Sequence, residues 1–341
     1  MGSTERGAKA AAAAQVAAAR AGRQRSCFAE GTEIMMGDGS LKKIEDIVSV
    51  LKNKEGFKMV SYEPDGDYNR TVVTLLGDPR YIVDALVELT GKALEHIDMN
   101  FQTGEHARMG AVDVIPFIPI EEVTMEECVK YANEVAKKIN DKYEIPIFMY
   151  AEASNFKDRV KLPNIRKGEF EGMKEKIKEP KWKPDYGNAL IHPTFGVIGV
   201  GARIPLIAYN IDLKTDNTKT ANAIAKAIRF SSGGFRHVQA GPVYLEQRGH
   251  VQVTMNILDY KKNPIYRILE TVKMEALRYG VEVTGCELVG LMPKGALLNS
   301  LKYYLTINDI EYNKDMSFET MTELAIKYIG FRDFNQLKII E

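Results

Sequence analysis

The chain has 341 residues, of which 45% are hydrophobic, so it can form two compact domains with cores of their own. Its 46 basic and 46 acidic residues cancel, which favours neither nucleic acid nor a membrane surface as a partner. Three widely spaced cysteines, Cys27, Cys128 and Cys286, predict neither a disulfide framework nor a structural zinc site. Because no apolar stretch approaches the roughly 18 residues of a membrane span, we expect a cytoplasmic protein.

Residues 1–26 are rich in Ala and Arg and carry a single acidic residue. Ala favours helix but gives such a helix no distinct face to bury. We therefore expect a frayed helix or a disordered, non-native tail here. An organelle transit peptide is the alternative, since such peptides are also rich in Arg and poor in acidic residues.

From Leu41 onward, segments of helical period alternate with short β-branched runs, which predicts layered α/β structure. In the first half we predict helices at 43–54, 79–97 and 124–142, and strands at 58–62, 70–76, 112–119 and 147–151. In the second half we predict strands at 206–213, 237–246, 250–258 and 286–293, and helices at 218–230 and 264–279. The second set has the order β-α-β-β-α-β of a ferredoxin-like domain. The predicted fold is α/β (α+β), with two ferredoxin-like subdomains at 27–205 and 206–341.

Residues 152–186 are rich in Lys, Pro and Gly and show little periodicity, which predicts a long loop between the two halves. A loop of this length in a compact protein is usually functional. Two domains joined in this way would leave a cleft between them, and such clefts are preferred sites for small ligands.

The stretch 103–120, TGEHARMGAVDVIPFIPI, places His106 between Glu105 and Arg108 in a polar loop that leads into an apolar strand. The unperturbed pKa of imidazole lies nearest neutrality, which suits this side chain to acid–base catalysis. A histidine in a loop can equally be exposed or form a structural hydrogen bond. The pattern alone leaves both interpretations open.

The stretch 61–71, SYEPDGDYNRT, is a charged turn that ends at the start of a strand. Glu63 could orient a histidine or receive a substrate amine. Arg70, which follows Asn69, could hold a carboxylate through a bidentate contact. The alternative is a hairpin turn with solvated charges.

The stretch 182–203, WKPDYGNALIHPTFGVIGVGAR, alternates small residues with apolar ones, so its backbone could closely approach a flat ligand. The GxG that begins at Gly199 is not a dinucleotide fingerprint, because the strand-to-helix turn and the third glycine are missing. NAD binding is therefore rejected. His192, within this stretch, is either a ligand contact or a structural residue.

Taken together, these stretches resemble the formiminotransferase family, the glutamate formimidoyltransferases of histidine breakdown. The matching text, in this order, is DYNRTVVTLLGDP, HIDMNFQTGEHARMGAVDVIPFIPI, LPNIRKGEFEGM, KWKPDYGNALIHPTFG and TGCELVGLMPKGALL. The resemblance extends from the region of Ile44 to the C-terminus.

The resemblance implies that folate binds in a crevice between two ferredoxin-like subdomains and that the protein is a homodimer. It implies that His106 is the catalytic residue, with Ala107 where the family has proline. Glu63, Asn69 and Arg70 are expected near the site, and Arg203 is a further candidate for binding a substrate carboxylate. The implied folate-binding segment is Gly187, Asn188, Ala189, Leu190, Ile191, His192, Pro193, Thr194, Phe195 and Gly196.

The implied reaction moves the formimino group of N-formimino-L-glutamate to tetrahydrofolate, the co-substrate, and gives 5-formiminotetrahydrofolate and glutamate. It requires no metal. The alternatives are formyl transfer by the same site and a folate-binding module without turnover. Bifunctional animal members carry a cyclodeaminase domain that we do not expect here, so the product would be released without processing.

The N-terminus departs from the family pattern, because a VPNFSEG-like stretch is missing. In its place, residues 27–47 read CFAEGTEIMMGDGSLKKIEDI and resemble the opening block of an intein or hedgehog-type autoprocessing domain. There, a leading cysteine starts an N-to-S acyl shift, but such a module needs a much longer sequence, so we do not expect autoprocessing. A chimeric reading frame, or a divergent N-terminus that still supplies the first strand, would explain the mixture.

Overall fold

The computed structural model describes residues 9–17, 33–35, 41–65, 69–103, 106–246 and 248–340, with side chains from Ile44 onward except that of Asp65. The chain divides between Ile204 and Pro205 into two compact units, called unit 1 and unit 2. The division falls one residue from the expected boundary.

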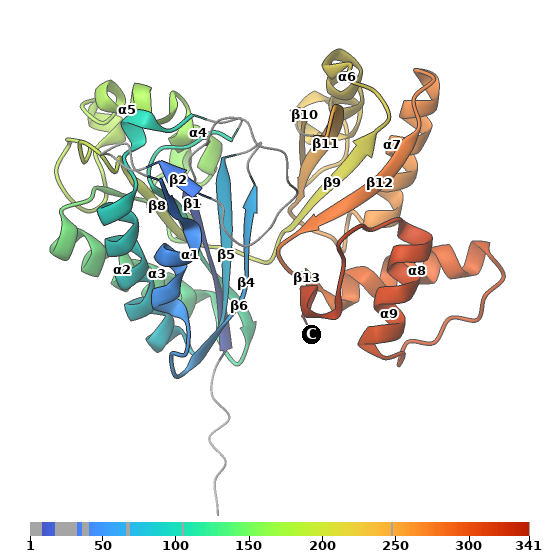
Figure 1. Cartoon of the computed structure of the whole chain (residues 1–341), viewed down its shortest axis with the longest axis horizontal. Coiled ribbons are helices and arrows are strands. Elements are labelled where there is room, and N and C mark those ends of the chain that lie inside the picture. The colour runs from blue at the N-terminus through green and yellow to red at the C-terminus, as the bar shows by residue number, and fades with distance from the viewer. Residues whose placement is uncertain are drawn as a thin grey trace, which may run out of the picture. The chain divides into compact units, whose positions relative to one another are not determined.

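Unit 1 is built on a six-stranded sheet with the order β4-β5-β1-β6-β8-β7. Neighbouring strands are antiparallel from β4 to β6, whereas β6, β8 and β7 run parallel. Helices α1, α2 and α3 line one face of this sheet (Figure 1). The strands are β1 (Lys9–Ala17), β4 (Phe57–Asp65), β5 (Arg70–Gly77), β6 (Val112–Glu121), β7 (Ile147–Ala151) and β8 (Ile198–Ala202), and the helices are α1 (Ile44–Val48), α2 (Pro79–His96) and α3 (Met125–Tyr143).

Strand β1 corrects the expectation for the Ala-rich segment, because residues 9–17 form neither a helix nor a tail. Ala17 pairs with Arg70 on one side, and Val16 pairs with Val112 on the other. The helix propensity of Ala is a weak preference, whereas the main-chain groups of β5 and β6 need hydrogen-bonding partners. This position agrees with a divergent N-terminus that supplies the first strand.

With β1 as first strand, the core of unit 1 has the element order β-α-β-β-α-β, formed by β1, α1, β4, β5, α2 and β6. This order is compatible with the expected ferredoxin-like arrangement. Helix α3 and the parallel strands β7 and β8 extend the sheet beyond β6. Strand β8 was not among the predicted strands.

Two of the predicted helices of unit 1, α2 and α3, begin at capping residues. Asp78 accepts a hydrogen bond from the main-chain N–H of Arg80, and Pro79 occupies the first turn of α2. Thr124 and Glu127 form a reciprocal capping box at the start of α3. Each cap satisfies main-chain N–H groups that the helix itself leaves without partners.

Residues 152–186 are not the structureless loop that their composition predicts. They contain two short helices, α4 (Leu162–Arg166) and α5 (Glu169–Lys176). Arg159, only 2% exposed, lies 2.9 Å from the carboxylate of Asp185 and donates to the carbonyls of Lys181 and Lys183. Arg159 thus fixes residues 181–185, and Lys176 of α5 donates to the carbonyls of Asn164 and Ile165 in α4. Such contacts leave no periodic signal in the sequence.

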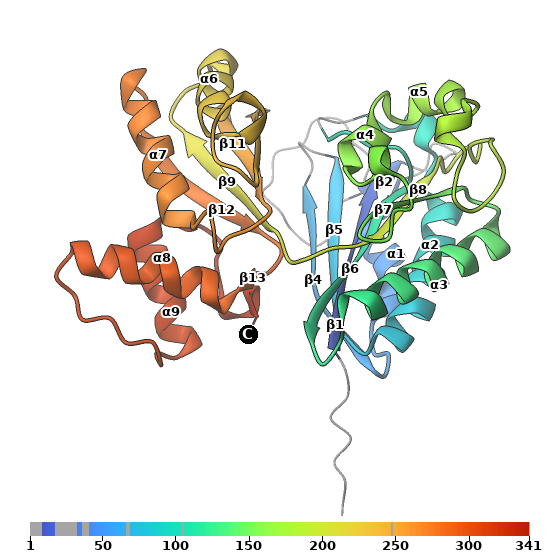
Figure 2. The same cartoon turned by 180° about the vertical axis from the view of Figure 1, so that it is seen from behind.

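Unit 2 contains an antiparallel sheet with the order β10-β11-β9-β12, again built from elements in the order β-α-β-β-α-β (Figure 2). The elements are β9 (Ile207–Leu213), α6 (Thr218–Ile228), β10 (Val238–Leu245), β11 (His250–Ile257), α7 (Ile265–Arg278) and β12 (Val283–Val289). The predicted strand 286–293 is divided between β12 and the short strand β13 (Met292–Pro293). Beyond it lie elements that were not predicted, namely α8 (Lys294–Ile307), α9 (Phe318–Leu324) and β14 (Ile339–Ile340), which pairs with β13.

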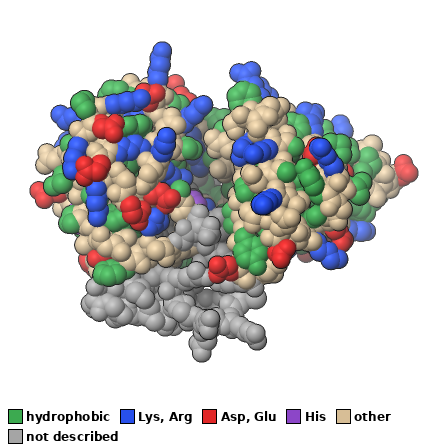
Figure 3. Space-filling model, turned by 90° about the horizontal axis from the view of Figure 1, so that it is seen from above, with side chains coloured by type: hydrophobic (Ala, Val, Ile, Leu, Met, Phe, Trp, Pro, Cys, Tyr) green, Lys and Arg blue, Asp and Glu red, His purple; other side chains and the backbone are tan. Residues whose placement is uncertain are grey.

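The described surface carries charges of both signs. On the face shown in Figure 3, acidic and basic side chains are interspersed, which fits the balanced composition. Among the described residues, no helix combines the length and the apolar character needed to cross a bilayer.

Two described strands fall within the stretch 27–47. Strands β2 (Glu33–Met35) and β3 (Leu41–Lys43) pair antiparallel, and α1 begins at Ile44. Residues 27–32 and 36–40, which carry most of the intein-like text, lie outside the described residues.

Candidate functional site

Four of the predicted site segments meet at one end of the sheet of unit 1. Asp65 at the end of β4 pairs with Arg70 at the start of β5, and Val16 near the end of β1 pairs with Val112 at the start of β6. Strand β8 is parallel to β6, so the segment before it reaches the same end. The topology thus brings together Glu63, Asn69 with Arg70, the His106 loop and residues 187–196.

The loop that carries His106 is held at both ends by the segment before β8. At its start, the N–H of Met99 donates to the carbonyl of Thr194 at 2.7 Å. At its end, the N–H of Ala111 donates to the carbonyl of Phe195 at 2.9 Å. The predicted catalytic loop and the predicted folate-binding segment are therefore direct neighbours.

Two glycines permit this close approach. A Cβ on Gly110 would lie 2.2 Å from the carbonyl oxygen of Val197, and a Cβ on Gly196 would lie 2.2 Å from that of Met109. Gly196 also has a φ of 89°, in the left-handed region that favours glycine. No other residue fits either position without moving the backbone of the site.

His106 is half-buried at the centre of this loop. Burial lowers its pKa well below the usual value for histidine, and the positive charges of Arg70 and Arg166 lower it further. At neutral pH the imidazole is therefore uncharged and can accept a proton. Glu105, which precedes it, lies outside the described residues.

Asn69 links the turn between β4 and β5 to the His106 loop. Its side chain donates to the main-chain carbonyl of Thr103, and it is 6% exposed. Its φ of 48° is left-handed, a conformation that Asn tolerates better than most residues. Asn69 therefore has a structural role that also sets the position of Arg70.

The structure adds two residues that sequence reasoning missed, Asp113 and Arg166. Asp113, 3% exposed, accepts a hydrogen bond from the N–H of Met109 at 2.8 Å and pairs with the guanidinium of Arg166. An acidic residue inside the apolar run AVDVIPF was a signal that could have identified Asp113. Arg166 comes from α4, and nothing in its local sequence points to the site.

The two terminal nitrogens of the Arg108 guanidinium are bound by acidic and carbonyl groups. Its guanidinium lies 2.8 Å from Glu169 and 2.7 Å from Glu171, and it donates to the carbonyl of Gln102 at 2.6 Å. Phe170 donates in turn to the main-chain carbonyl of Arg108. Arg108 therefore connects the loop to α5.

The segment 187–196 contains both exposed and buried residues. Residues 187–190 and 193 are exposed, whereas Ile191, Phe195 and Gly196 are buried. The Nδ1 atom of His192 accepts a hydrogen bond from the N–H of Phe195 at 3.2 Å. Nδ1 of His192 therefore holds the turn, which leaves the exposed backbone before it available to a ligand.

Glu63 and Arg203 lie toward opposite ends of the sheet of unit 1. Glu63 is half-buried on β4, two residues before the end of the strand. Arg203 follows the opposite end of β8, where its N–H donates to Phe117 and its side chain contacts Tyr150. Burial lowers the pKa of the Arg203 guanidinium. Within unit 1, then, Arg203 does not lie at the His106 end of the strand.

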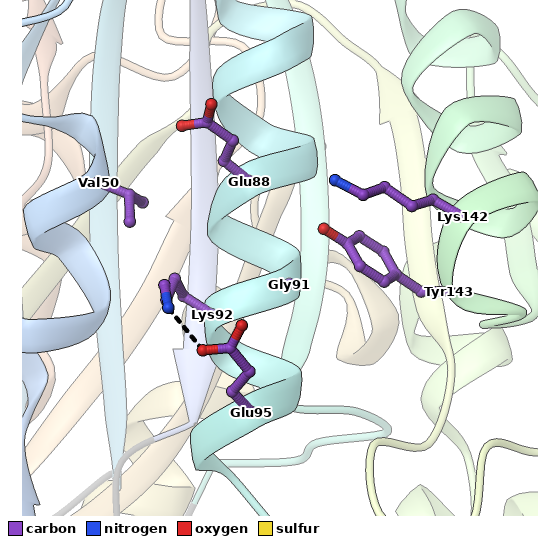
Figure 4. Close-up of a pocket in the computed structure, with 7 residues that line it drawn as sticks. All are labelled: Val50, Glu88, Gly91, Lys92, Glu95, Lys142 and Tyr143. Carbon is purple, nitrogen blue, oxygen red and sulfur yellow. Dashed lines mark hydrogen bonds and ion pairs between the residues drawn. The ribbon is translucent and has the colours of Figure 1, made fainter.

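A surface pocket of about 320 Å³ lies elsewhere in unit 1 (Figure 4). It lies between α2, α3 and the turn after α1, and its lining residues are Val50, Glu88, Gly91, Lys92, Glu95, Lys142 and Tyr143. Lys92 and Glu95 form an ion pair at 2.6 Å within it. None of the predicted site residues contributes to this pocket.

The described residues hold no group of three or more His, Cys, Asp or Glu side chains placed to bind a metal ion. Burial raises the pKa of Cys128 to about 11 and that of Cys286 to about 12. Both thiols are therefore protonated at neutral pH, which makes them poor nucleophiles.

Comparison with known proteins places these segments in a family. A family model described as "Formiminotransferase domain, N-terminal subdomain" matches residues 38–203, and one described as "Formiminotransferase domain" matches residues 208–341. The first match begins inside the intein-like stretch and excludes β1.

Individual relatives agree with this assignment. Glutamate formimidoyltransferase of Streptococcus pyogenes is 46% identical over 80% of this chain and 91% of that protein. The protein of the same name from Thermoplasma acidophilum is 41% identical over 79% and 89%. Formimidoyltransferase-cyclodeaminase of Dictyostelium discoideum is 37% identical over 77% of this chain but only 50% of that protein. With both of its units matched and its site segments gathered at one end of a sheet, the chain belongs to the formiminotransferase family.

Proposed function

We propose that this protein transfers the formimino group of N-formimino-L-glutamate to tetrahydrofolate and releases 5-formiminotetrahydrofolate and glutamate. The 46% identity to a glutamate formimidoyltransferase supports this reaction. The single structural observation that carries it is the contact of the His106 loop with Thr194 and Phe195, at the end of the sheet where Arg70 begins β5. The charges of Arg70 and Arg166 act on the imidazole there and, together with burial, lower its pKa. A base and two cations at one place suit a reaction between an amine and an anionic formimino donor.

In the proposed mechanism, the N5 amine of tetrahydrofolate attacks the formimino carbon and a tetrahedral intermediate forms. His106 accepts the proton that N5 loses. It then returns this proton to the glutamate nitrogen as the bond between that nitrogen and the formimino carbon breaks. An imidazole that is uncharged at the start of the cycle is required for the first of these steps.

The guanidinium groups are proposed to bind carboxylates. Both N-formimino-L-glutamate and the glutamate tail of folate are anionic, and a guanidinium holds a carboxylate through two parallel hydrogen bonds. Arg70 and Arg166 are the residues proposed for this task, and the ion pair with Asp113 would orient Arg166. Glu63 would stabilise the cationic formimino group. Arg203 stays a proposed contact for a carboxylate of either substrate. It follows the end of β8 opposite to the His106 loop.

The exposed backbone of residues 187–190, together with the rest of 187–196, is proposed to bind folate. The expected cleft between the two subdomains, the homodimer and the cytoplasmic location belong to the same proposal, since they follow from the family resemblance.

The test is a transfer assay with the purified chain, tetrahydrofolate and N-formimino-L-glutamate, in which the product is followed by its absorbance. N-formyl-L-glutamate serves as the matched donor, because it differs only in having O in place of NH. We expect turnover with the formimino donor and much less with the formyl donor. Saturable folate binding without turnover would instead identify a binding module and contradict the proposal.

A further inference from the structure

Unit 2 carries a polar cluster on the face of its sheet opposite the helices. Tyr209, Ile211 and Leu213 of β9 belong to the hydrophobic core, so the alternate residues Asn210 and Asp212 lie on the other face. The same alternation on β11 and β12 places further polar side chains beside them. The cluster consists of Asn210, Asp212, Gln252, Thr254, Glu287 and Arg332.

Strand register arranges these side chains in two rows. Gln252 pairs with Asp212, and Gly285 is the partner of Asp212 on the other side. The second row contains Thr254, Asn210 and Glu287. Because Gly285 has no side chain, the first row is open above β12, and the guanidinium of Arg332 reaches Asp212 there at 2.6 Å.

The carboxylate of Asp212 already has its donors. Its Oδ1 accepts from Gln252 at 2.7 Å and lies 3.2 Å from Nε2 of His250. Arg332 donates to both oxygens, through Nε at 2.6 Å and Nη2 at 3.3 Å. This part of the cluster fastens residues 330–332 to the sheet and has a structural role.

Glu287 and Gln252 are different, because their acceptor capacity exceeds the donors around them. Glu287 receives three hydrogen bonds, from Asn210, Gln252 and Arg332, each 3.3 Å long and all to Oε2. Gln252 is 0% exposed, and its Oε1 accepts no hydrogen bond from the described residues. A buried amide oxygen without a donor costs free energy unless a ligand or water supplies one.

We propose that this face of unit 2 binds the N–C–N unit of a substrate, whose adjacent N–H groups donate to Glu287 and Gln252. The ligand chemistry is that of an amidine, in which one carbon is bonded to two nitrogen atoms and each nitrogen can donate an N–H hydrogen bond. Two substrates contain it, the formimino group itself and the 2-amino-4-oxopyrimidine ring of folate. Arg332 at the same place suits the ring oxygen or a substrate carboxylate. This inference rests on the proposed function, which supplies both ligands.

The test uses the full chain and two probes, 6-methyltetrahydropterin and N-formimino-L-glutamate, with binding measured by titration calorimetry. The pterin has the ring but no glutamate tail, and the second probe has the formimino group but no ring. The variant is Glu287→Gln, which keeps size and removes charge. The matched control is Glu282→Gln, because Glu282 lies just before the same strand and pairs with Lys214 at the surface.

We expect Glu287→Gln to weaken one probe by roughly 10- to 100-fold, the value of a charge-assisted hydrogen bond, and Glu282→Gln to weaken neither. A loss confined to the pterin assigns the ring to this face, and a loss confined to the other probe assigns the formimino group. If Glu287→Gln lowers the melting temperature, Glu287→Asp replaces it and should show a smaller loss. Wild-type affinity for both probes in a folded Glu287 variant overturns the inference and would indicate that water alone satisfies Gln252.

The transfer assay separates this failure from that of the proposed function. If the wild-type chain catalyses transfer but the Glu287 variants bind both probes normally, only the site in unit 2 is contradicted. If the wild-type chain shows no turnover but binds the pterin in a way that depends on Glu287, the proposed function is contradicted and the site is supported. Absence of binding by either probe to the wild-type chain overturns the site.

Discussion

The carboxylate of Asp113 accepts a hydrogen bond from the main-chain N–H of Met109 at 2.8 Å, three residues after His106. The same carboxylate pairs with Arg166, whose charge lowers the pKa of His106. One buried acidic residue on β6 therefore fixes both the end of the His106 loop and a cation beside the imidazole. The chemistry proposed for this loop depends on that connection.

Removal of the imidazole should affect turnover far more than binding. We expect His106→Ala to lower kcat by roughly 10²- to 10⁴-fold, the usual contribution of a general base, with a small change in folate affinity. His237→Ala, at a histidine of unit 2, is the control and should retain full activity. Steady-state kinetics with both variants provide the measurement, and wild-type kcat in His106→Ala would remove this residue from the mechanism.

The pH dependence of kcat/KM should report the lowered pKa of His106. Since the neutral imidazole is the active form, activity falls as pH decreases through this pKa and is constant above it, with the midpoint below the usual value for histidine. Removing a neighbouring positive charge makes protonation easier, so Arg166→Gln should move the acid limb to higher pH. Arg80→Gln, at an exposed arginine on α2, should leave the profile unchanged. An acid limb that does not move in Arg166→Gln would contradict the assignment.

Gly196 and Gly168 share a left-handed backbone but differ in their surroundings. A Cβ on Gly196 would lie 2.2 Å from a main-chain oxygen, whereas one on Gly168 would meet its nearest atom at an ordinary 3.4 Å. Gly168→Ala should therefore cost only the conformational penalty of about 1–2 kcal/mol. Gly196→Ala should lower the free energy of unfolding by about 2–5 kcal/mol and reduce turnover, because the His106 loop must move. Urea unfolding and kinetics would show this, and equal effects of the two variants would refute the close approach.

Periodicity and caps predict most of the regular elements. Strand β7 was predicted at 147–151, where it lies, and α2 begins at the predicted Pro79. These elements carry their own signals, an apolar run in β7 and an N-terminal Asp-Pro in α2. Local sequence is sufficient for such elements.

Elements that depend on partners far away in sequence were missed, because local sequence carries no signal for them. Strand β1 reads as helix because Ala dominates it, and only its two neighbours in the sheet make it a strand. Helices α4 and α5 are held by partners far away in sequence, since Arg166 of α4 pairs with Asp113 and Glu169 of α5 pairs with Arg108. In the site, His106 and residues 187–196 were predicted separately by resemblance. The contact between these two segments and the effect of Arg166 on the pKa of His106 arise between residues far apart in sequence.

The buried pair of Arg159 and Asp185 should be essential for unit 1. Arg159→Met removes one partner and leaves Asp185 buried with its charge, which typically costs about 3–5 kcal/mol. Lys137→Ala, which breaks an exposed ion pair with Asp141 on α3, should have little effect. Because residues 181–186 lead into Gly187, the surviving folded fraction of Arg159→Met should also bind folate less tightly. Chemical unfolding monitored at Trp182 tests the first effect, and unchanged stability would argue against a buried pair.

Strand β1 can be tested with a single proline. Ala13→Pro removes a main-chain N–H from a strand that is bonded on both sides, a position that proline does not tolerate. We expect loss of hydrogen-exchange protection in β5 and β6, with β9 and β11 of unit 2 unaffected. Ala13→Val, a strand-compatible change, is the control. Full protection of β5 in the proline variant would contradict the position of β1 in the sheet and would indicate that residues 9–17 are a tail.

The position of β1 ahead of its sheet neighbours in the sequence has a consequence for biosynthesis. This strand leaves the ribosome before the other strands of its sheet, yet Lys9 pairs with Glu121, so the pairing with its second neighbour is complete only after α2 and β6 have been translated. Until then β5 and β1 can form only an incomplete sheet with an open edge, the kind of surface on which nascent chains aggregate. Conditions that slow translation after residue 121 would give this sheet time to close.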